Sequence, residues 1–185
     1  MKLSEEEKKY LLTIARRSIE YPLKNGQIFH PDLSLITSNL KENMPTFVTL
    51  YVDKQLHGCI GTLKAFRPLA QDVAYNAYSA AFEDHRFPDI MNDDLSRLSI
   101  EISLLSKAIP IEFNSKEDLL SQLKINEDGV ILVSGEHQAT FLPSVWKSLP
   151  DKEQFLEKLT LKAGLTSGYW SDQFKIFKYS VEKIV

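Results

Sequence analysis

Residues Thr46 to Leu63 read TFVTLYVDKQLHGCIGTL, and this stretch decides the fold of the chain. Its first arm, Phe47 to Val52, is rich in β-branched and aromatic residues, which favour strands. A short polar segment, Asp53-Lys54-Gln55, separates that arm from a second one ending at Leu63. The pattern predicts two strands that pair as an antiparallel hairpin inside the main sheet.

The second arm contains the only cysteine of the chain, Cys59, between Gly58 and Gly61. Because side chains alternate along a strand, His57 and Cys59 are expected on one face and Leu56 on the other. Glycine inside a strand marks a bulge, or a place where a backbone or a ligand approaches closely. Two interpretations follow. The arm is either a chemical site, with a thiol, an imidazole and bare main-chain amides, or it packs Cys59 as a small buried hydrophobe.

Two charged residues elsewhere are candidates for the same site. Leu98 to Leu105 alternates apolar and polar residues, and Glu101 lies in mid-strand, where glutamate is uncommon. If its strand neighbours that of Cys59, the two side chains share a face. Arg86, within Asp84-His85-Arg86-Phe87-Pro88, has a fixed charge suited to a carboxylate or phosphate ligand. Its alternative role is a salt bridge to an acidic neighbour in its own turn.

The remaining segments indicate a mixture of helices and strands. Asn76 lies on or beside the apolar face of one helix and is expected to tie down a neighbouring loop. Together the elements predict an α+β fold, a mostly antiparallel sheet of five to seven strands flanked by about four helices. Helices are expected over about 5–20, ended by Tyr21-Pro22, over 68–82, from Ser115, and from Pro150 to Gly164, and further strands over 98–105, 129–133, 139–142 and 177–181.

Length and composition are those of an ordinary globular protein. The chain has 185 residues, of which 43% are hydrophobic and 25% charged, which suits one domain or two small lobes. The net charge of −3 and the absence of a Lys/Arg run predict no general affinity for nucleic acid. No apolar run is long enough for a signal core or a membrane span, so we expect a cytoplasmic protein without membrane contact.

Several chemistries have no sequence signal. A lone cysteine excludes an intramolecular disulfide and a zinc site built from cysteines. The chain has no phosphate-binding loop, no dinucleotide fingerprint, no HExxH and no CxxC. We therefore expect no resident cofactor or metal.

The segment LHGCIGTL (Leu56–Leu63) resembles LRGCIGTL, the signature of the AMMECR family, which is called AmmeMemoRadiSam system protein A in prokaryotes. The family usually has Arg at the position of His57 and Pro at that of His85. The resemblance continues in order along nearly the whole chain, through RPL at 67–69, DHRFP at 84–88, IEIS at 100–103, ATFLP at 139–143 and KAGL at 162–165.

The resemblance implies a single AMMECR-like domain over residues 1–185, with a larger and a smaller lobe and the GCIG motif near the cleft between them. It also implies a Memo-type protein and a radical-SAM enzyme as partners. Two functions stay open. The chain is an enzyme component acting on a small molecule or modified nucleobase, with Cys59 as nucleophile, His57 or Arg86 favouring its thiolate and Glu101 shuttling a proton. Alternatively, it is a non-catalytic protein-interaction module in which GCIG is a structural seam.

Overall fold

The computed structural model describes residues 3–185, which divide by their internal packing into two compact units. The first unit comprises the chain up to Leu105 together with Glu182–Val185, and the second comprises Ser106–Val181. In chain order the elements are α1 (Glu5–Asn25), η1 (Leu33–Leu35), α2 (Ser38–Lys41), β1 (Thr46–Val52), β2 (Gln55–Gly61), α3 (Leu69–Phe82), η2 (Asn92–Asp94), β3 (Leu98–Leu105), β4 (Ile109–Ile111), α4 (Lys116–Gln122), β5 (Gly129–Ser134), β6 (His137–Phe141), η3 (Pro143–Lys147), α5 (Lys152–Lys162), β7 (Lys175–Tyr179) and β8 (Val181–Ile184).

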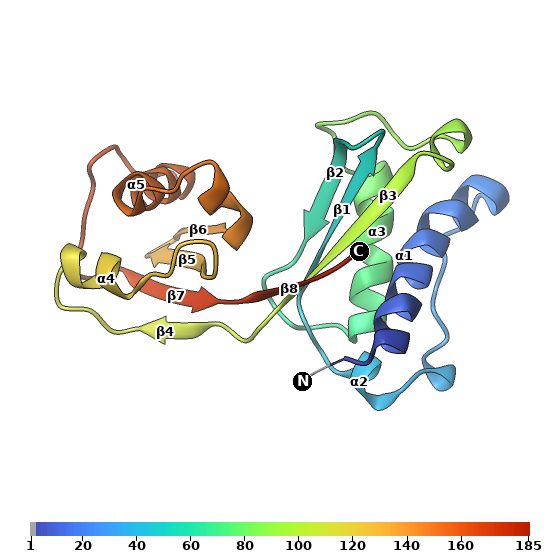
Figure 1. Cartoon of the computed structure of the whole chain (residues 1–185), viewed down its shortest axis with the longest axis horizontal. Helices are drawn as coiled ribbons and strands as arrows, with labels where there is room; N and C mark the ends of the chain where they lie inside the picture. Colours follow the sequence, from blue (N-terminus) through green and yellow to red (C-terminus); the bar gives the residue numbers. More distant parts are fainter. Residues whose placement is uncertain (1–2) are drawn as a thin grey trace. The chain divides into compact units, whose positions relative to one another are not determined.

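The strands of the described residues form two sheets (Figure 1). Each sheet has its own hydrophobic core. The first has the order β2-β1-β3-β8 and the second the order β4-β7-β5-β6. The predicted α+β class with mostly antiparallel pairing is confirmed. The prediction of one sheet with five to seven strands is wrong, because the strands of residues 3–185 form two separate four-stranded sheets.

The predicted hairpin is confirmed, since β1 and β2 pair antiparallel. A two-residue turn joins them, with positive φ at both Asp53 (50°) and Lys54 (66°), as a type I′ turn requires. Arg97 donates hydrogen bonds to the carboxylates of Asp53 and Asp94, which fastens this turn to the segment before β3. Because β3 pairs with the other side of β1, the first arm of the hairpin is an inner strand.

Helix α3 packs very closely on one face of this sheet, where it lies beside α1 (Figure 1). A Cβ placed on Gly58 would lie only 2.1 Å from the main-chain oxygen of Ala80. The same face carries Val48 and Leu50, which are fully buried. A Cβ on Gly61 would meet the Phe47 ring at 2.2 Å. Both glycines are therefore required by packing, and the predicted bare backbone at these positions is covered.

A buried polar network joins the start of β1 to α3. Asp72 is 1% exposed, and its carboxylate accepts hydrogen bonds from the Thr46 amide (3.0 Å), the Thr46 hydroxyl (2.8 Å) and Arg67 Nε (3.1 Å). Asn76 donates to the Thr46 carbonyl (3.1 Å) and to Asp72 (2.9 Å). The structural role expected of Asn76 is confirmed, but its amide holds the first residue of a strand instead of a loop.

Helix α1 is longer than predicted. Ser4 and Glu7 form the expected capping box, but the helix passes through Pro22 and ends at Asn25. Proline has no N–H to donate and its ring crowds the carbonyl four residues earlier, but α1 continues through Pro22 for one further turn. Gly26, with φ of 67°, ends the helix and donates its N–H to the Pro22 carbonyl at 2.8 Å.

The second unit is built around β5, an apolar strand that lies between β7 and β6. Trp146 and Phe155 stack at 3.6 Å in its core. The predicted strand over 177–181 is instead two strands, β7 and β8. Ser180 interrupts them, because its amide and carbonyl bond to Ser106.

Burial raises the pKa of the Tyr179 phenol to about 12.

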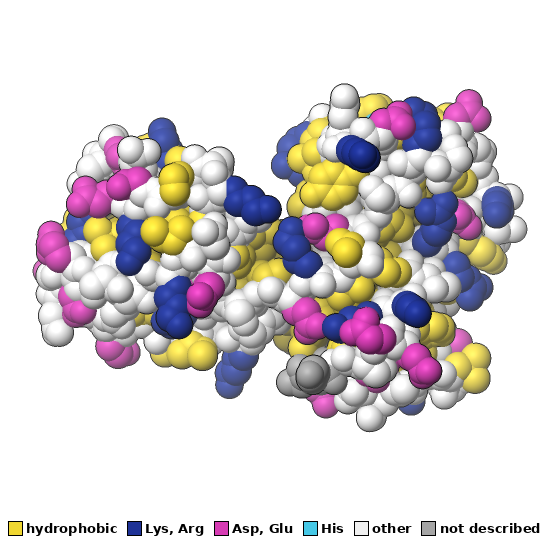
Figure 2. Space-filling model, viewed as in Figure 1, with side chains coloured by type: hydrophobic (Ala, Val, Ile, Leu, Met, Phe, Trp, Pro, Cys, Tyr) yellow, Lys and Arg dark blue, Asp and Glu magenta, His cyan; other side chains and the backbone are white. Residues whose placement is uncertain are grey.

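The mixed distribution of charged side chains on the surface agrees with the small net charge of −3. Figure 2 shows one face, on which lysine and arginine side chains are interspersed with aspartate and glutamate. Within residues 3–185 no helix has the length and apolar character needed to cross a membrane.

The close approach of α3 makes a stability prediction. Replacing Gly58 by Ala should lower the free energy of unfolding by about 1–3 kcal/mol, because the obstructing atom is a backbone oxygen that no side-chain rotation can move. Guanidinium denaturation measures the loss. The control is Cys59→Ser, which changes the neighbouring residue but adds no atom against α3 and should cost less. Equal stability of Gly58→Ala and the natural protein would contradict the packing described.

Candidate functional site

Cys59 lies in a row of polar side chains that crosses the first sheet. Because Gly58 faces α3, strand alternation turns Cys59 to the opposite face. Thr49 pairs with Cys59 on one side and with Glu101 on the other, so these three side chains lie next to one another. Lys183, from β8, places its Nζ 2.6 Å from Glu101 Oε1. Cys59, Thr49, Glu101 and Lys183 are called the polar row below.

The thiol of Cys59 is half-buried and contacts a hydroxyl. Its Sγ lies 3.3 Å from Thr49 Oγ1. The Thr62 amide donates to the Thr46 carbonyl at 2.9 Å, and hydrogen-bonded and non-hydrogen-bonded pairs alternate along an antiparallel ladder. Thr49 and Cys59 are therefore a non-hydrogen-bonded pair, in which side chains are closest. The main-chain N–H and C=O of Cys59 consequently point away from β1, to the outer edge of the sheet.

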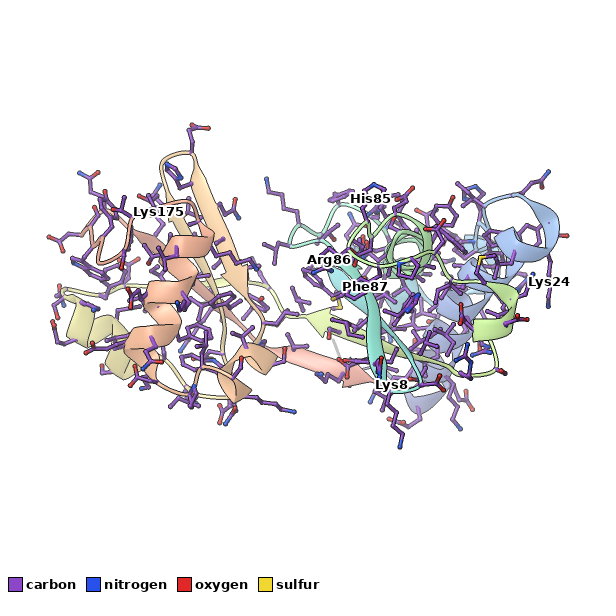
Figure 3. All side chains as sticks on the ribbon, turned by 90° about the horizontal axis from the view of Figure 1, so that it is seen from above. Lys8, Lys24, His85, Arg86, Phe87 and Lys175 are labelled. Carbon is purple, nitrogen blue, oxygen red and sulfur yellow. The ribbon has the colours of Figure 1, made fainter. Side chains whose placement is uncertain are left out.

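Asp84 and Arg86 bind this outer edge. The Cys59 amide donates to Asp84 Oδ2 at 2.9 Å, and Arg86 Nη2 donates to the Cys59 carbonyl at 3.1 Å. Arg86 also holds Asp84 through two side-chain hydrogen bonds, from Nε (2.8 Å) and from Nη2 (2.7 Å), and through its main-chain amide at 3.4 Å. We call this arrangement the edge clamp; Figure 3 shows Arg86 between His85 and Phe87, beside the strand. The clamp occupies the hydrogen-bonding groups that an edge strand leaves open.

The clamp is an ion pair with one buried member. The Asp84 side chain is 4% exposed, whereas that of Arg86 is 62% exposed. The hydrogen bonds from Arg86, and to a smaller extent the one from the Cys59 amide, lower the pKa of Asp84 to about 2. Asp84 is thus ionised at neutral pH, and its charge is balanced at the site. The salt bridge foreseen as the alternative role of Arg86 is confirmed.

His57 lies in a β-bulge that the sequence pattern did not reveal. Leu50 pairs with Gly58, but the next residue of β1, Tyr51, pairs with Leu56, which leaves His57 without a partner in the ladder. Leu56 consequently shares the face of Cys59, and the strict alternation that put it on the opposite face is wrong. The His57 ring stacks on Phe87 with centroids 6.2 Å apart, and its Nε2 is buried without a partner among the described residues.

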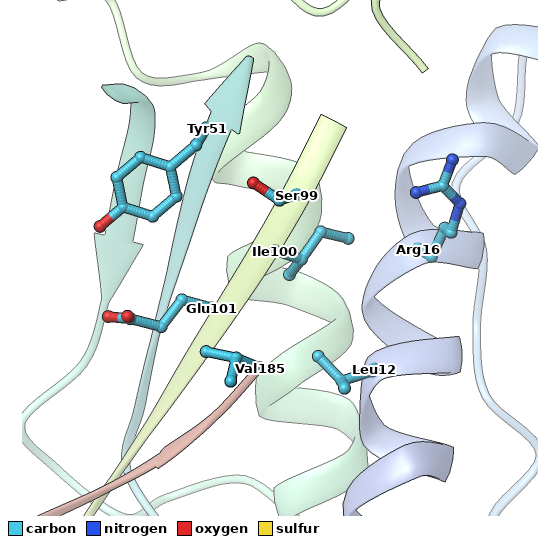
Figure 4. A pocket seen from close by; sticks show the side chains of 7 residues that line it. All are labelled: Leu12, Arg16, Tyr51, Ser99, Ile100, Glu101 and Val185. Carbon is cyan, nitrogen blue, oxygen red and sulfur yellow. The ribbon is translucent and has the colours of Figure 1, made fainter. Parts of the chain in front are cut away.

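A cavity of about 470 Å³ adjoins the far end of the polar row. Figure 4 shows Tyr51 and Glu101 projecting to one side of the sheet, with Leu12 and Arg16 contributed by α1. Burial, and to a smaller extent the charge of Glu101, raise the pKa of the Tyr51 phenol. Arg16 is already engaged, since it donates to the Leu95 carbonyl at 2.6 Å. Glu101 is likewise paired with Lys183, so the polar lining side chains without a hydrogen bond among residues 3–185 are Tyr51 and Ser99, both from the sheet.

The structure brings Cys59 and Glu101 to the same face of the sheet, but on strands that are not adjacent. Cys59 and Glu101 share a face, but β1 lies between their strands, so they are neighbours along a row and do not oppose each other. The sequence reasoning missed Thr49, Tyr51 and Lys183. The first two had a signal, since polar Thr49 and Tyr51 alternate with Val48 and Leu50. Within residues 3–185, no three His, Cys, Asp or Glu side chains are grouped closely enough for a metal.

Comparison with known proteins gives consistent matches over nearly the whole chain. The AMMECR1 family model matches residues 12–184. A protein of Thermofilum pendens is 33% identical, and the match covers 100% of this chain and 92% of that protein. A protein of Thermococcus gammatolerans is 32% identical, and the match covers 98% of this chain and 91% of that protein. The crystal structure of an uncharacterized protein from Pyrococcus horikoshii has a TM-score of 0.88 at 31% identity, covering 99% of this chain and 93% of that one.

The edge clamp predicts a specific loss of stability in acid. The pKa of the Asp84 carboxyl falls from 3.8 to about 2 on folding, so the carboxylate stabilises the native state above pH 3.8. This stabilisation is lost as the pH falls to about 2. Asp84→Asn should therefore lower the free energy of unfolding by about 1–2 kcal/mol at pH 7, since the exposed Arg86 is partly screened by solvent.

The free energies of unfolding of Asp84→Asn and of the natural protein should converge as the pH falls from 4 to 2. Urea denaturation at each pH measures both. Asp89→Asn, in the same loop but exposed, is the matched control and should change little. A loss of equal size at every pH would mean that the Asp84 charge is not what stabilises the strand.

Proposed function

Because this chain belongs to the AMMECR1 family, we propose that it is an enzyme component whose reactive group is the Cys59 thiol. Its substrate is a small molecule or a modified nucleobase. It works alongside a Memo-type protein and a radical-SAM enzyme, the partners that the family name AmmeMemoRadiSam implies. The iron–sulfur chemistry then belongs to the radical-SAM partner, and this chain contributes nucleophilic and acid–base groups.

The observation that carries the proposal is the polar row. A structural cysteine is ordinarily packed among apolar side chains. Cys59 is instead half-exposed, contacts the Thr49 hydroxyl at 3.3 Å, and shares its sheet face with a carboxylate–ammonium pair, Glu101 and Lys183. A nucleophile, a hydroxyl and an acid–base pair on one rigid sheet are the parts that covalent catalysis needs.

Each residue has a role in this proposal. Cys59 loses its proton to Glu101 through water, and the thiolate adds to an unsaturated carbon of the substrate, whose π electron pair moves onto the attached oxygen or nitrogen and takes up the proton from Glu101. Arg86 favours the thiolate by balancing the buried Asp84 carboxylate, which binds the Cys59 amide and would otherwise oppose a second negative charge there. His57 has the weakest geometric support, because its ring stacks on Phe87 and makes no hydrogen bond with Cys59 in the described part of the chain.

The alternative function is a protein-interaction module in which GCIG is a structural seam. The packing of Gly58 on Ala80 and of Gly61 on Phe47 favours it, because both glycines serve the fold and leave no space for a ligand. The edge clamp favours it too, since Asp84 and Arg86 are used to hold a strand. Under this alternative the Cys59 side chain is dispensable.

Alkylation of the folded protein separates the two functions. Under the enzyme proposal, iodoacetamide labels Cys59 near neutral pH without denaturant. Arg86→Ala should slow labelling because it leaves the Asp84 carboxylate uncompensated beside the thiolate. His57→Arg, which introduces the family's usual residue, should accelerate labelling because a positive charge near the sulfur favours the thiolate. Labelling is followed by intact-mass spectrometry over a range of pH.

The control is Lys24→Ala, which removes an exposed positive charge from the last turn of α1 in the first unit and should leave the rate unchanged. Thermal melts of each variant show that the labelled protein is folded. If Cys59 reacts only after denaturation, and neither Arg86→Ala nor His57→Arg alters its rate, the nucleophile proposal fails and the structural seam stands.

A further inference from the structure

Tyr51 lies near Cys59 and has no role in the mechanism proposed above. It follows Thr49 by two positions in β1, so the two side chains lie on the same face of the sheet. Because Thr49 pairs with Glu101 on one side and with Cys59 on the other, Tyr51 is a diagonal neighbour of Glu101 and, across the bulge, of Cys59. Diagonal neighbours lie about 7–8 Å apart, which is within the reach of an aromatic side chain.

The phenol of Tyr51 is free to bind a ligand. Its partner in the ladder is Leu56, which has no polar side-chain atom, and the phenol makes no hydrogen bond within residues 3–185. Figure 4 shows the Tyr51 ring and the Glu101 carboxylate projecting to the same side of the sheet. Burial raises the pKa of the phenol, and the charges of Glu101 and Cys59 add to this effect against an opposite one from Lys183. Tyr51 is therefore a protonated hydrogen-bond donor beside the thiol at neutral pH.

The cavity next to the polar row lies against this phenol. Its volume of about 470 Å³ is within the range that is typical of small-molecule sites. Tyr51 and Glu101 line the cavity from the face that also carries Cys59, and Leu12 and Ile100 add apolar walls. A molecule in this cavity can bury an apolar part against these walls while it presents a polar group to Tyr51.

The charged side chains of the cavity favour an uncharged molecule. Arg16 is paired with Glu20 at 2.8 Å. Glu101 is paired with Lys183 at 2.6 Å. A charged ligand would have to break one of these pairs or give up its hydration without a partner, and both are unfavourable. The group that accepts a hydrogen bond from Tyr51 is accordingly neutral, such as a carbonyl oxygen or the nitrogen of an imine or a nitrile.

We propose that Tyr51 binds and polarises the substrate of Cys59, and that this substrate is an uncharged small molecule with a C=O, C=N or C≡N group joined to an apolar part. The inference rests on the proposed function of Cys59. The thiolate adds to the carbon of that group, so a C–S bond forms as one π bond breaks. The π electron pair moves onto the oxygen or nitrogen, which accepts a hydrogen bond from Tyr51 and takes up the proton that Glu101 received from the thiol. Tyr51 keeps its own proton.

Two probes that react differently with a thiolate test this role. 2-Cyanopyrimidine accepts the thiolate at its nitrile carbon, so negative charge develops on a nitrogen, whereas iodoacetamide loses iodide and develops no charge on oxygen or nitrogen. Tyr51→Phe removes only the hydroxyl. It should slow the addition of Cys59 to 2-cyanopyrimidine about a hundredfold, because the loss of one donor to a developing anion costs about 10²–10³ in rate. The iodoacetamide rate should stay within about twofold of the natural rate, since its reaction gives Tyr51 no anion to stabilise. Intact-mass spectrometry follows both reactions.

Tyr78→Phe is the matched control, since Tyr78 is a similarly half-buried tyrosine on α3, outside this cavity, and both rates should stay unchanged. If Cys59 of the folded natural protein reacts with neither probe, the proposed function itself fails. The role of Tyr51 alone is overturned if Cys59 reacts with iodoacetamide but not with the nitrile, if Tyr51→Phe leaves the nitrile rate unchanged, or if both rates fall by the same factor. Thermal melts show that each variant is folded.

Discussion

The contact of Gly58 with the Ala80 carbonyl is the constraint on which the site depends. No other residue type fits there, because even a Cβ would lie 2.1 Å from a backbone oxygen. Since neighbouring side chains in a strand point to opposite faces, seating Gly58 on α3 obliges Cys59 to face the other way. The order of two residues, glycine then cysteine, thus directs the thiol away from the apolar core and into the polar row.

The same helix also delivers the edge clamp. Asp84 and Arg86 follow the end of α3 directly, so the helix that sits on Gly58 carries their loop to the outer edge of β2. An edge strand has open hydrogen-bonding groups that invite pairing with another chain. Here a buried carboxylate and a guanidinium fill them at Cys59. The backbone of this residue is therefore held from two directions while its side chain remains half-exposed.

Much of the first unit could be predicted from local sequence because its signals are local. The hairpin followed from β-branched residues around a polar turn, and the face of Glu101 followed from alternation in β3. The bulge at His57 could not be predicted, since it depends on how β2 meets β1. Lys183 had no signal, because it reaches Glu101 only after the chain has passed through the whole second unit. The division of the strands into two sheets likewise depends on long-range packing.

Amide hydrogen exchange at Cys59 tests most directly whether its backbone is locked at the sheet edge. By the alternation of the ladder, the amides of Cys59 and Gly61 both point outward from β2, but the described residues include a side-chain acceptor, Asp84, for Cys59 alone. The account predicts that the Cys59 amide exchanges much more slowly than that of Gly61, and that Asp84→Asn removes the difference while β1 stays protected. Equally fast exchange at both amides in the natural protein would contradict it.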